Sequence, residues 1–80
     1  MKKYIIYGRS NCPFCIKIIT KLAKANKRFY AHMLEEGSKE LEEMKEKWEH
    51  PTVPIVIEVS ESQKLIGGCD DTMKLLENES

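Results

Sequence analysis

The residues best suited to chemistry are two cysteines that enclose a short C-P-F-C motif at residues 12–15. Pro13 fits the first position of a helix, where its missing N–H costs nothing and its φ is already helical. Cys12 is then the N-cap residue, and Cys15 lies in the first helical turn. A thiolate at Cys12 can accept hydrogen bonds from the free amides of Phe14 and Cys15, and it lies at the positive end of the helix dipole.

These conditions predict that Cys12 is a nucleophile. Helix N-termini and nearby cations, here Arg9, lower the pKa of a cysteine from about 8.5 into the range of roughly 3.5–7.5. The thiolate is the form that attacks a disulfide. Cys15 is close enough to form a disulfide with Cys12 and, inside the helix, should be the more buried and less reactive thiol. The motif therefore predicts a dithiol redox site.

Half of a zinc site is the alternative interpretation of the two cysteines. Structural zinc needs four ligands, which commonly come as two closely spaced pairs. The other candidates, Cys69, His32 and His50, are each isolated in the sequence. A redox site without a metal is therefore favoured over a metal or iron–sulfur binding module. Cys69 is expected to be a small buried residue and not a third redox centre.

The length and composition predict a single domain over residues 1–80. Hydrophobic residues make up 41% of the chain and charged residues 32%, as in ordinary soluble proteins. No segment approaches the roughly 18 apolar residues of a membrane span, and the apolar run at residues 4–7 is too short for a signal peptide. Three cysteines do not suit a secreted disulfide scaffold. We expect a cytoplasmic monomer.

The net charge of zero hides an asymmetry along the chain. Residues 1–34 contain eight Lys and Arg and no acid, whereas residues 35–80 contain five Lys and all thirteen acids, so the two parts carry +8 and −8. Solvated helix faces explain most of this pattern. The basic part also contains the C-P-F-C motif, where a positive field would favour a thiolate. Nucleic-acid binding is not expected, because there is no global basic excess and no basic–aromatic motif.

The elements that position the motif are predicted in the order β-α-β-α-β-β-α. Alternation, helical periodicity and turn residues place them, and the two prolines at residues 51 and 54 make residues 50–54 a loop. An early βαβ unit implies a parallel strand pair, and a late hairpin adds an antiparallel pair. Strands are expected at residues 3–7, 29–34, 55–59 and 64–66, and helices at residues 13–26, 39–49 and from Asp70 or Asp71 onward.

Three segments of the chain closely resemble the glutaredoxin family in its short bacterial and bacteriophage form. They are Y-G-R-S-N-C-P-F-C at residues 7–15, T-V-P at residues 52–54 and G-G-C-D-D at residues 67–71. The resemblance extends over essentially the whole chain. It implies an α/β domain with the thioredoxin fold, in which a four-stranded mixed sheet is flanked by three helices. The W-C-G-P-C motif of thioredoxins is absent, and the second cysteine, which monothiol glutaredoxins typically replace, is present.

The resemblance also implies a glutathione site. The Val53–Pro54 bond would be cis and would lie against the thiols, with the Val53 backbone turned to pair with an extended peptide such as glutathione. Asp70 and Asp71 would take the γ-glutamyl ammonium, amides at the start of the last helix would take its carboxylate, and Arg9 would attract the glycyl carboxylate. The glutathione-binding residues implied in this way are Arg9, Phe14, Thr52, Val53, Pro54, Gly68, Cys69, Asp70 and Asp71.

The activity that the resemblance implies is glutathione-dependent reduction of protein disulfides and glutathione mixed disulfides. Cys12 would be the nucleophile and Cys15 the resolving thiol, with ribonucleotide reductase as one protein substrate suggested by the family. Two positions depart from the family's usual residues: Phe14 stands where Tyr is common, and His50-Pro51 stands where basic residues often precede T-V-P. The alternative is a thioredoxin-like electron donor that is reduced by a flavin reductase.

Overall fold

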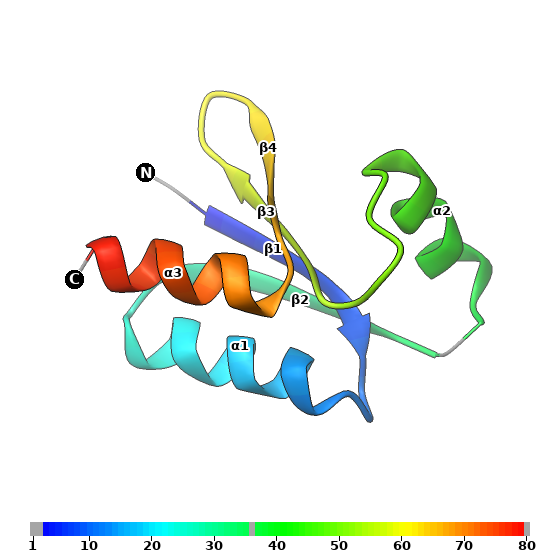
Figure 1. Ribbon diagram of the computed structural model, residues 1–80, viewed down its shortest axis with the longest axis horizontal. Helices are drawn as coiled ribbons and strands as arrows, with labels where there is room; N and C mark the ends of the chain where they lie inside the picture. The colour runs from blue at the N-terminus through cyan, green and yellow to red at the C-terminus, as the bar shows by residue number, and fades with distance from the viewer. Residues whose placement is uncertain (1–2, 36, 80) are drawn as a thin grey trace.

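The computed structural model describes residues 3–35 and 37–79. Within these residues, four strands and three helices follow one another in the expected order (Figure 1). The elements are β1 (Lys3–Arg9), α1 (Pro13–Lys24), β2 (Arg28–Leu34), α2 (Lys39–Lys47), β3 (Ile55–Val59), β4 (Gln63–Gly67) and α3 (Cys69–Glu79). Along the same residues, no helix has the length and apolar character that crossing a membrane requires.

The strands form one mixed sheet in the order β2-β1-β3-β4. β1 pairs in parallel with β2, so that Tyr4 lies opposite Phe29, and antiparallel with β3, so that Ile6 lies opposite Val56. β3 and β4 form the expected antiparallel hairpin, with an irregularity at residues 56 and 57. The βαβ unit and the hairpin therefore meet at β1 and β3, and the sheet has the thioredoxin-fold arrangement that the family resemblance implied.

The helices cover both faces of this sheet. α1 and α3 lie side by side on one face and begin at the same end of the molecule, while α2 lies apart from them (Figure 1). Alternate strand residues point toward α1 and α3, where they form the main core. Its buried residues are Tyr4, Ile6, Ile18, Leu22, Val56, Cys69 and Leu76. Leu41 of α2 is also fully buried, whereas Met44 and Trp48 are half-buried.

The C-terminal ends of α1 and α2 are set by residues with left-handed backbone. After α1, Asn26 has a φ of 56° and the Lys27 N–H donates to the Leu22 carbonyl at 3.0 Å. After α2, Glu49 has a φ of 52° and the His50 N–H donates to the Lys45 carbonyl at 2.9 Å. These caps satisfy carbonyls that the helix leaves unpaired. They end both helices two residues before the expected boundaries at residues 26 and 49.

The N-terminal ends depend on side chains and on a glycine. Ser38 is the N-cap of α2, and its Oγ accepts a hydrogen bond from the Leu41 N–H at 3.2 Å. α3 begins at Cys69, earlier than the expected Asp70 or Asp71, because the Gly68 carbonyl already accepts the Thr72 N–H at 3.1 Å. Carboxylates in the first turn of a helix are stabilised by the helix dipole, so both aspartates fit inside α3 as well as before it.

Candidate active site

Cys12 lies where the C-P-F-C motif predicts, at the start of α1. Its backbone is extended, with φ of −95° and ψ of 115°, and Pro13 is the first helical residue. The Cys12 N–H donates to the Arg9 carbonyl at 3.1 Å, and its carbonyl accepts the Ile16 N–H at 3.2 Å. The thiol forms no close capping hydrogen bond with the helix amides. The strand end at Arg9 therefore fixes the backbone of the nucleophile, and the helix supplies the field around it.

The pKa of Cys12 is lowered from its ordinary value. Burial acts against the thiolate and raises the pKa, but a hydrogen bond from the Cys15 thiol, the amides of Cys15 and Phe14, and the charge of Arg9 together outweigh it. The amides and the cation are the two influences that the sequence predicted, and the Cys15 thiol adds a third. Cys12 is thus the thiol of this site that ionises most readily.

Cys15 has the opposite chemistry. Its side chain is fully buried, and its pKa is raised to about 12, mainly by burial and also by its hydrogen bond to Cys12 and by the Cys12 charge. The Arg9 backbone and the Arg9 charge lower the pKa without offsetting these effects. The structure thus combines one thiol whose pKa is lowered with one that is buried and whose pKa is raised, which is the arrangement of an asymmetric dithiol.

We expect iodoacetamide to alkylate Cys12 selectively at pH 6.5. Because its pKa is lowered, Cys12 has a larger thiolate fraction at this pH than an ordinary thiol has. The raised pKa of Cys15, about 12, leaves this thiol almost entirely protonated at pH 6.5. Burial also raises the pKa of Cys69. Mass spectrometry of digests at pH 5–9 measures the three rates, and comparable labelling of Cys12 and Cys69 at pH 6.5 would contradict the prediction.

Gly8 in β1 makes room for the dithiol. A Cβ atom on Gly8 would lie 2.5 Å from the Cys15 Sγ and 3.1 Å from the Cys15 Cβ. Cys15 is fully buried and has no space to retreat. The glycine before the motif therefore allows the Cys15 side chain to pack directly against β1.

The Gly8→Ala substitution is expected to destabilise the protein by about 1–3 kcal/mol, the usual range for overpacking a core. For a domain of this size the unfolding midpoint would fall by at least about 4 °C. Gly68→Ala is the matched control, because a Cβ at Gly68 meets only ordinary contacts at 3.6 Å. Thermal unfolding of both variants checks this, and an unchanged midpoint for Gly8→Ala would show that the strand and helix can separate without cost.

A groove of about 840 Å³ brings the predicted site residues together. All of them line it except Cys15, which is buried beneath the surface. The predicted residues in the lining are Arg9, Cys12, Phe14, Thr52, Val53, Pro54, Gly68, Cys69, Asp70 and Asp71. The Val53–Pro54 bond is cis, as the resemblance implied, and Phe14 is 59% exposed at the groove.

The start of α3 forms one part of the groove. Gly67 has a φ of 131°, which disfavours any other residue, and a Cβ there would collide with the Asp71 carboxylate. Asp71 thus lies against the glycine turn. The Thr72 hydroxyl, on a fully buried side chain, donates to the carbonyl of the half-buried Gly68 at 2.8 Å. The G-G-C-D-D motif therefore shapes the backbone at the helix start and places two carboxylates beside Cys69.

Cys69 lines the groove together with the other residues that the resemblance assigned to glutathione, and it is also buried, as its small side chain predicted. It is 8% exposed and belongs to the main core, and its pKa is influenced by the charges of Lys17, Asp70 and Cys12. His32 is outside the groove lining and stacks on Tyr7 with ring centroids 5.0 Å apart. In the part of the chain that the structure describes, no three His, Cys, Asp or Glu side chains are placed to hold a metal ion.

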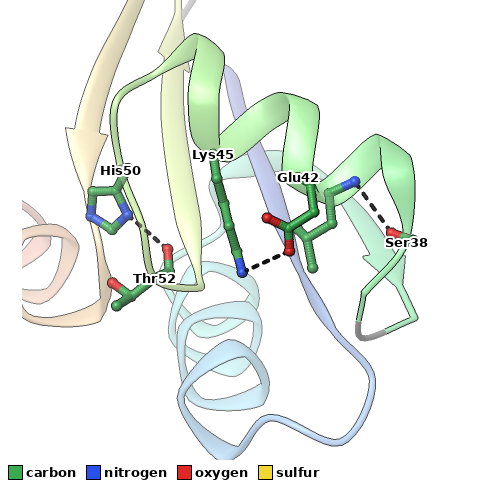
Figure 2. Close-up of polar contacts among 6 residues, drawn as sticks. Ser38, Glu42, Lys45, His50 and Thr52 are labelled. Atoms are coloured by element: carbon green, nitrogen blue, oxygen red, sulfur yellow. Dashed lines mark hydrogen bonds and ion pairs between the residues drawn. The ribbon is translucent and has the colours of Figure 1, made fainter.

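Sequence reasoning did not identify the contribution of α2 to the groove. Leu41, Glu42 and Lys45 line it, and the Lys45 Nζ lies 3.5 Å from a Glu42 carboxylate oxygen (Figure 2). The side chain of Lys45 is only 25% exposed. Glu and Lys three residues apart are common on solvated helices, so their spacing gave no signal of a site. Lys45 supplies a cation to the groove near the loop where His50-Pro51 replaces the family's usual basic residues.

Comparisons with known proteins agree with this geometry. A family model described as glutaredoxin matches residues 4–60. The chain is 35% identical over 74 residues to glutaredoxin-C6 of rice. The matched segment covers 89% of this chain and 63% of the rice protein. It therefore spans less than two thirds of the length of that relative.

Solved structures extend the comparison to the fold. Glutaredoxin 1 from Francisella tularensis, solved with cacodylate, has a TM-score of 0.77 at 20% identity, covering 99% of this chain and 96% of that one. A wheat glutaredoxin has a TM-score of 0.74 at 28% identity, covering 96% and 74%. At 20% identity, the likeness to the Francisella protein supports the fold alone. The family model and the rice relative match the amino-acid sequence itself. By its fold, its C-P-F-C site and its match to the family model, the chain belongs to the glutaredoxin family, whose members are thiol–disulfide oxidoreductases.

Proposed function

We propose that the protein is a glutathione-dependent thiol–disulfide oxidoreductase that reduces glutathione mixed disulfides and protein disulfides. The observation that carries the proposal is the groove, in which Cys12 shares one surface with the T-V-P segment and the start of α3. Two of the helices that line it, α1 and α3, do so with their N-terminal ends, where amides and dipoles favour anions. The proposed protein substrates include ribonucleotide reductase, on family resemblance alone.

The charges around the groove support a tripeptide that carries two carboxylates and one ammonium. Arg9 at the end of β1 and Lys45 on α2 are the cations of the lining, and we assign the glycyl carboxylate to them. Asp70 and Asp71 on α3 are assigned the γ-glutamyl ammonium, and the amides at the start of α3 its carboxylate. An extended peptide backbone would pair with Val53.

The proposed reaction is a series of thiol–disulfide exchanges. The Cys12 thiolate attacks the glutathione sulfur of a mixed disulfide, the old S–S bond breaks, and the substrate leaves as a thiolate that takes up a proton. A second glutathione thiolate then attacks the glutathione sulfur bonded to Cys12. This releases glutathione disulfide and restores the Cys12 thiolate. Each turnover therefore consumes one added glutathione, because the other half of the glutathione disulfide comes from the substrate.

Coupled turnover tests the proposal. Reduction of a glutathionylated peptide is followed through NADPH with glutathione and glutathione reductase, and in parallel with thioredoxin reductase in place of both. We expect turnover only in the first system. Turnover only with thioredoxin reductase would instead support the thioredoxin-like donor that the sequence left as the alternative.

A further inference from the structure

His50 links three segments that build the groove. Its backbone N–H donates to the Lys45 carbonyl at 2.9 Å and so closes the end of α2. Its side chain lines the groove, and it lies two residues before the T-V-P segment. A Cβ atom on Gly68 would lie 3.6 Å from the His50 Cε1 and 3.6 Å from the Pro54 carbonyl oxygen. The imidazole thus lies against the turn that precedes α3.

The ring also holds the loop itself. The His50 Nδ1 lies 2.7 Å from the Thr52 carbonyl oxygen (Figure 2). A carbonyl oxygen only accepts, so this hydrogen bond requires the proton on Nδ1 and leaves Nε2 unprotonated in the neutral ring. Pro51 and Pro54 have no N–H with which to fix the loop backbone. A side-chain donor therefore has more influence on the position of residues 52–54 than it would in a loop without prolines.

We propose that His50 is a positioning residue for the peptide substrate, acting through its Nδ1–H bond to the Thr52 carbonyl oxygen. The inference rests on the proposed function, because residues 52–54 are the segment to which an extended peptide would pair. Because the ring bonds to the Thr52 carbonyl and lies against Gly68, and the His50 backbone bonds to the Lys45 carbonyl, the segment is fixed before the peptide arrives. A segment that is already fixed loses less conformational entropy when the peptide binds.

This role is separable from the chemistry of the thiols and from the core. The influences on the Cys12 pKa come from Cys15, Phe14 and Arg9, and His50 is not among them. The ring is half-buried and lies outside the main core cluster. A change at His50 should therefore affect peptide binding while leaving the thiolate and the fold in place.

Two variants test the hydrogen bond. His50→Asn keeps an N–H donor at the same number of bonds from Cα as Nδ1, whereas His50→Leu keeps the bulk and removes the donor. The reduced protein is mixed with glutathione disulfide, or with bis(2-hydroxyethyl) disulfide, which has no peptide backbone. We expect His50→Leu to slow reduction of glutathione disulfide by about 2- to 10-fold, the effect of one neutral hydrogen bond. Its rate with the non-peptide disulfide should be unchanged, and His50→Asn should restore the first rate.

Two further readouts keep the proposal falsifiable. The ¹⁵N spectrum of the wild-type imidazole should show the Nδ1–H tautomer, and an Nε2–H tautomer would overturn the proposal. Equal rates of His50→Leu and wild type with glutathione disulfide would overturn it as well. If His50→Leu does not fold, His50→Ala replaces it, since alanine also lacks the donor. A wild type that fails to turn over with glutathione and glutathione reductase would instead refute the proposed glutathione dependence, and the role of His50 with it.

Discussion

The Cys12→Ser variant is expected to lose turnover of glutathione mixed disulfides by at least about 100-fold, the loss that follows removal of an essential nucleophile. A serine hydroxyl is not ionised near neutral pH, so neither Arg9 nor the helix amides can make it a useful nucleophile. Cys15 cannot replace it, because that thiol is fully buried and its pKa is raised to about 12, mainly by burial. The measurement is the glutathione-coupled assay with the wild type and the variant at equal concentration.

The fold of this variant should be intact, which makes the loss interpretable. Cys12 is the N-cap of α1, and serine is among the preferred N-cap residues, so the helix start is at least as stable as before. An unchanged thermal unfolding midpoint is the control. Residual turnover close to that of the wild type would assign the nucleophile elsewhere. Cys69 would then be the next thiol to replace, since it lines the same groove.

The order of the elements could be read from the sequence because each has a strong local pattern. The β-branched run at residues 55–59, the two prolines before it and the amphipathic face of α1 each favour one structure. The ends of the helices were less certain, because a left-handed residue sets them. Asn26 commonly takes this conformation, whereas Glu49 rarely does, so the cap after α2 has no reliable sequence signal.

The site was predictable where its residues form motifs and not where they come from a helix face. Cys12, Thr52 and Asp70 belong to short motifs whose spacing limits their position. Lys45 reaches the groove through the packing of α2 in the folded chain, and with its neighbours Met44 and Glu46 it forms no motif. The role of His50 was hidden for another reason: its hydrogen bond to the Thr52 carbonyl depends on loop conformation. The sequence showed only that His50 departs from the residues usual in the family.

The Cys15→Ser variant is expected to separate the two reactions of the site. Reduction of a glutathione mixed disulfide needs only Cys12 and should stay within about threefold of the wild type. Reduction of a protein disulfide should fall by at least about 10-fold, because an intramolecular thiol with a high effective concentration has been lost. Both are measured with one preparation of each protein, using a glutathionylated peptide and a disulfide-bonded protein as substrates.

The reason lies in how the charge on Cys12 controls Cys15. Burial is the largest cause of the raised Cys15 pKa, but the hydrogen bond to Cys12 and the Cys12 charge also raise it. Both disappear once the Cys12 sulfur is bonded to a substrate. The Cys15 pKa should then fall, although burial still raises it. We therefore expect Cys15 to attack the Cys12 sulfur more readily after the first exchange than before it.

A second substitution at the same position tests this coupling in the other direction. The Cys15 thiol is the foremost influence that lowers the Cys12 pKa. Serine keeps a donor there and alanine does not, so Cys15→Ala should have a higher Cys12 pKa than Cys15→Ser, measured by thiolate absorbance at 240 nm as pH is varied. Equal pKa values in the two variants would mean that the helix amides and Arg9 suffice to ionise Cys12.

Undiminished reduction of protein disulfides by either variant would mean that glutathione, and not Cys15, resolves the mixed disulfide.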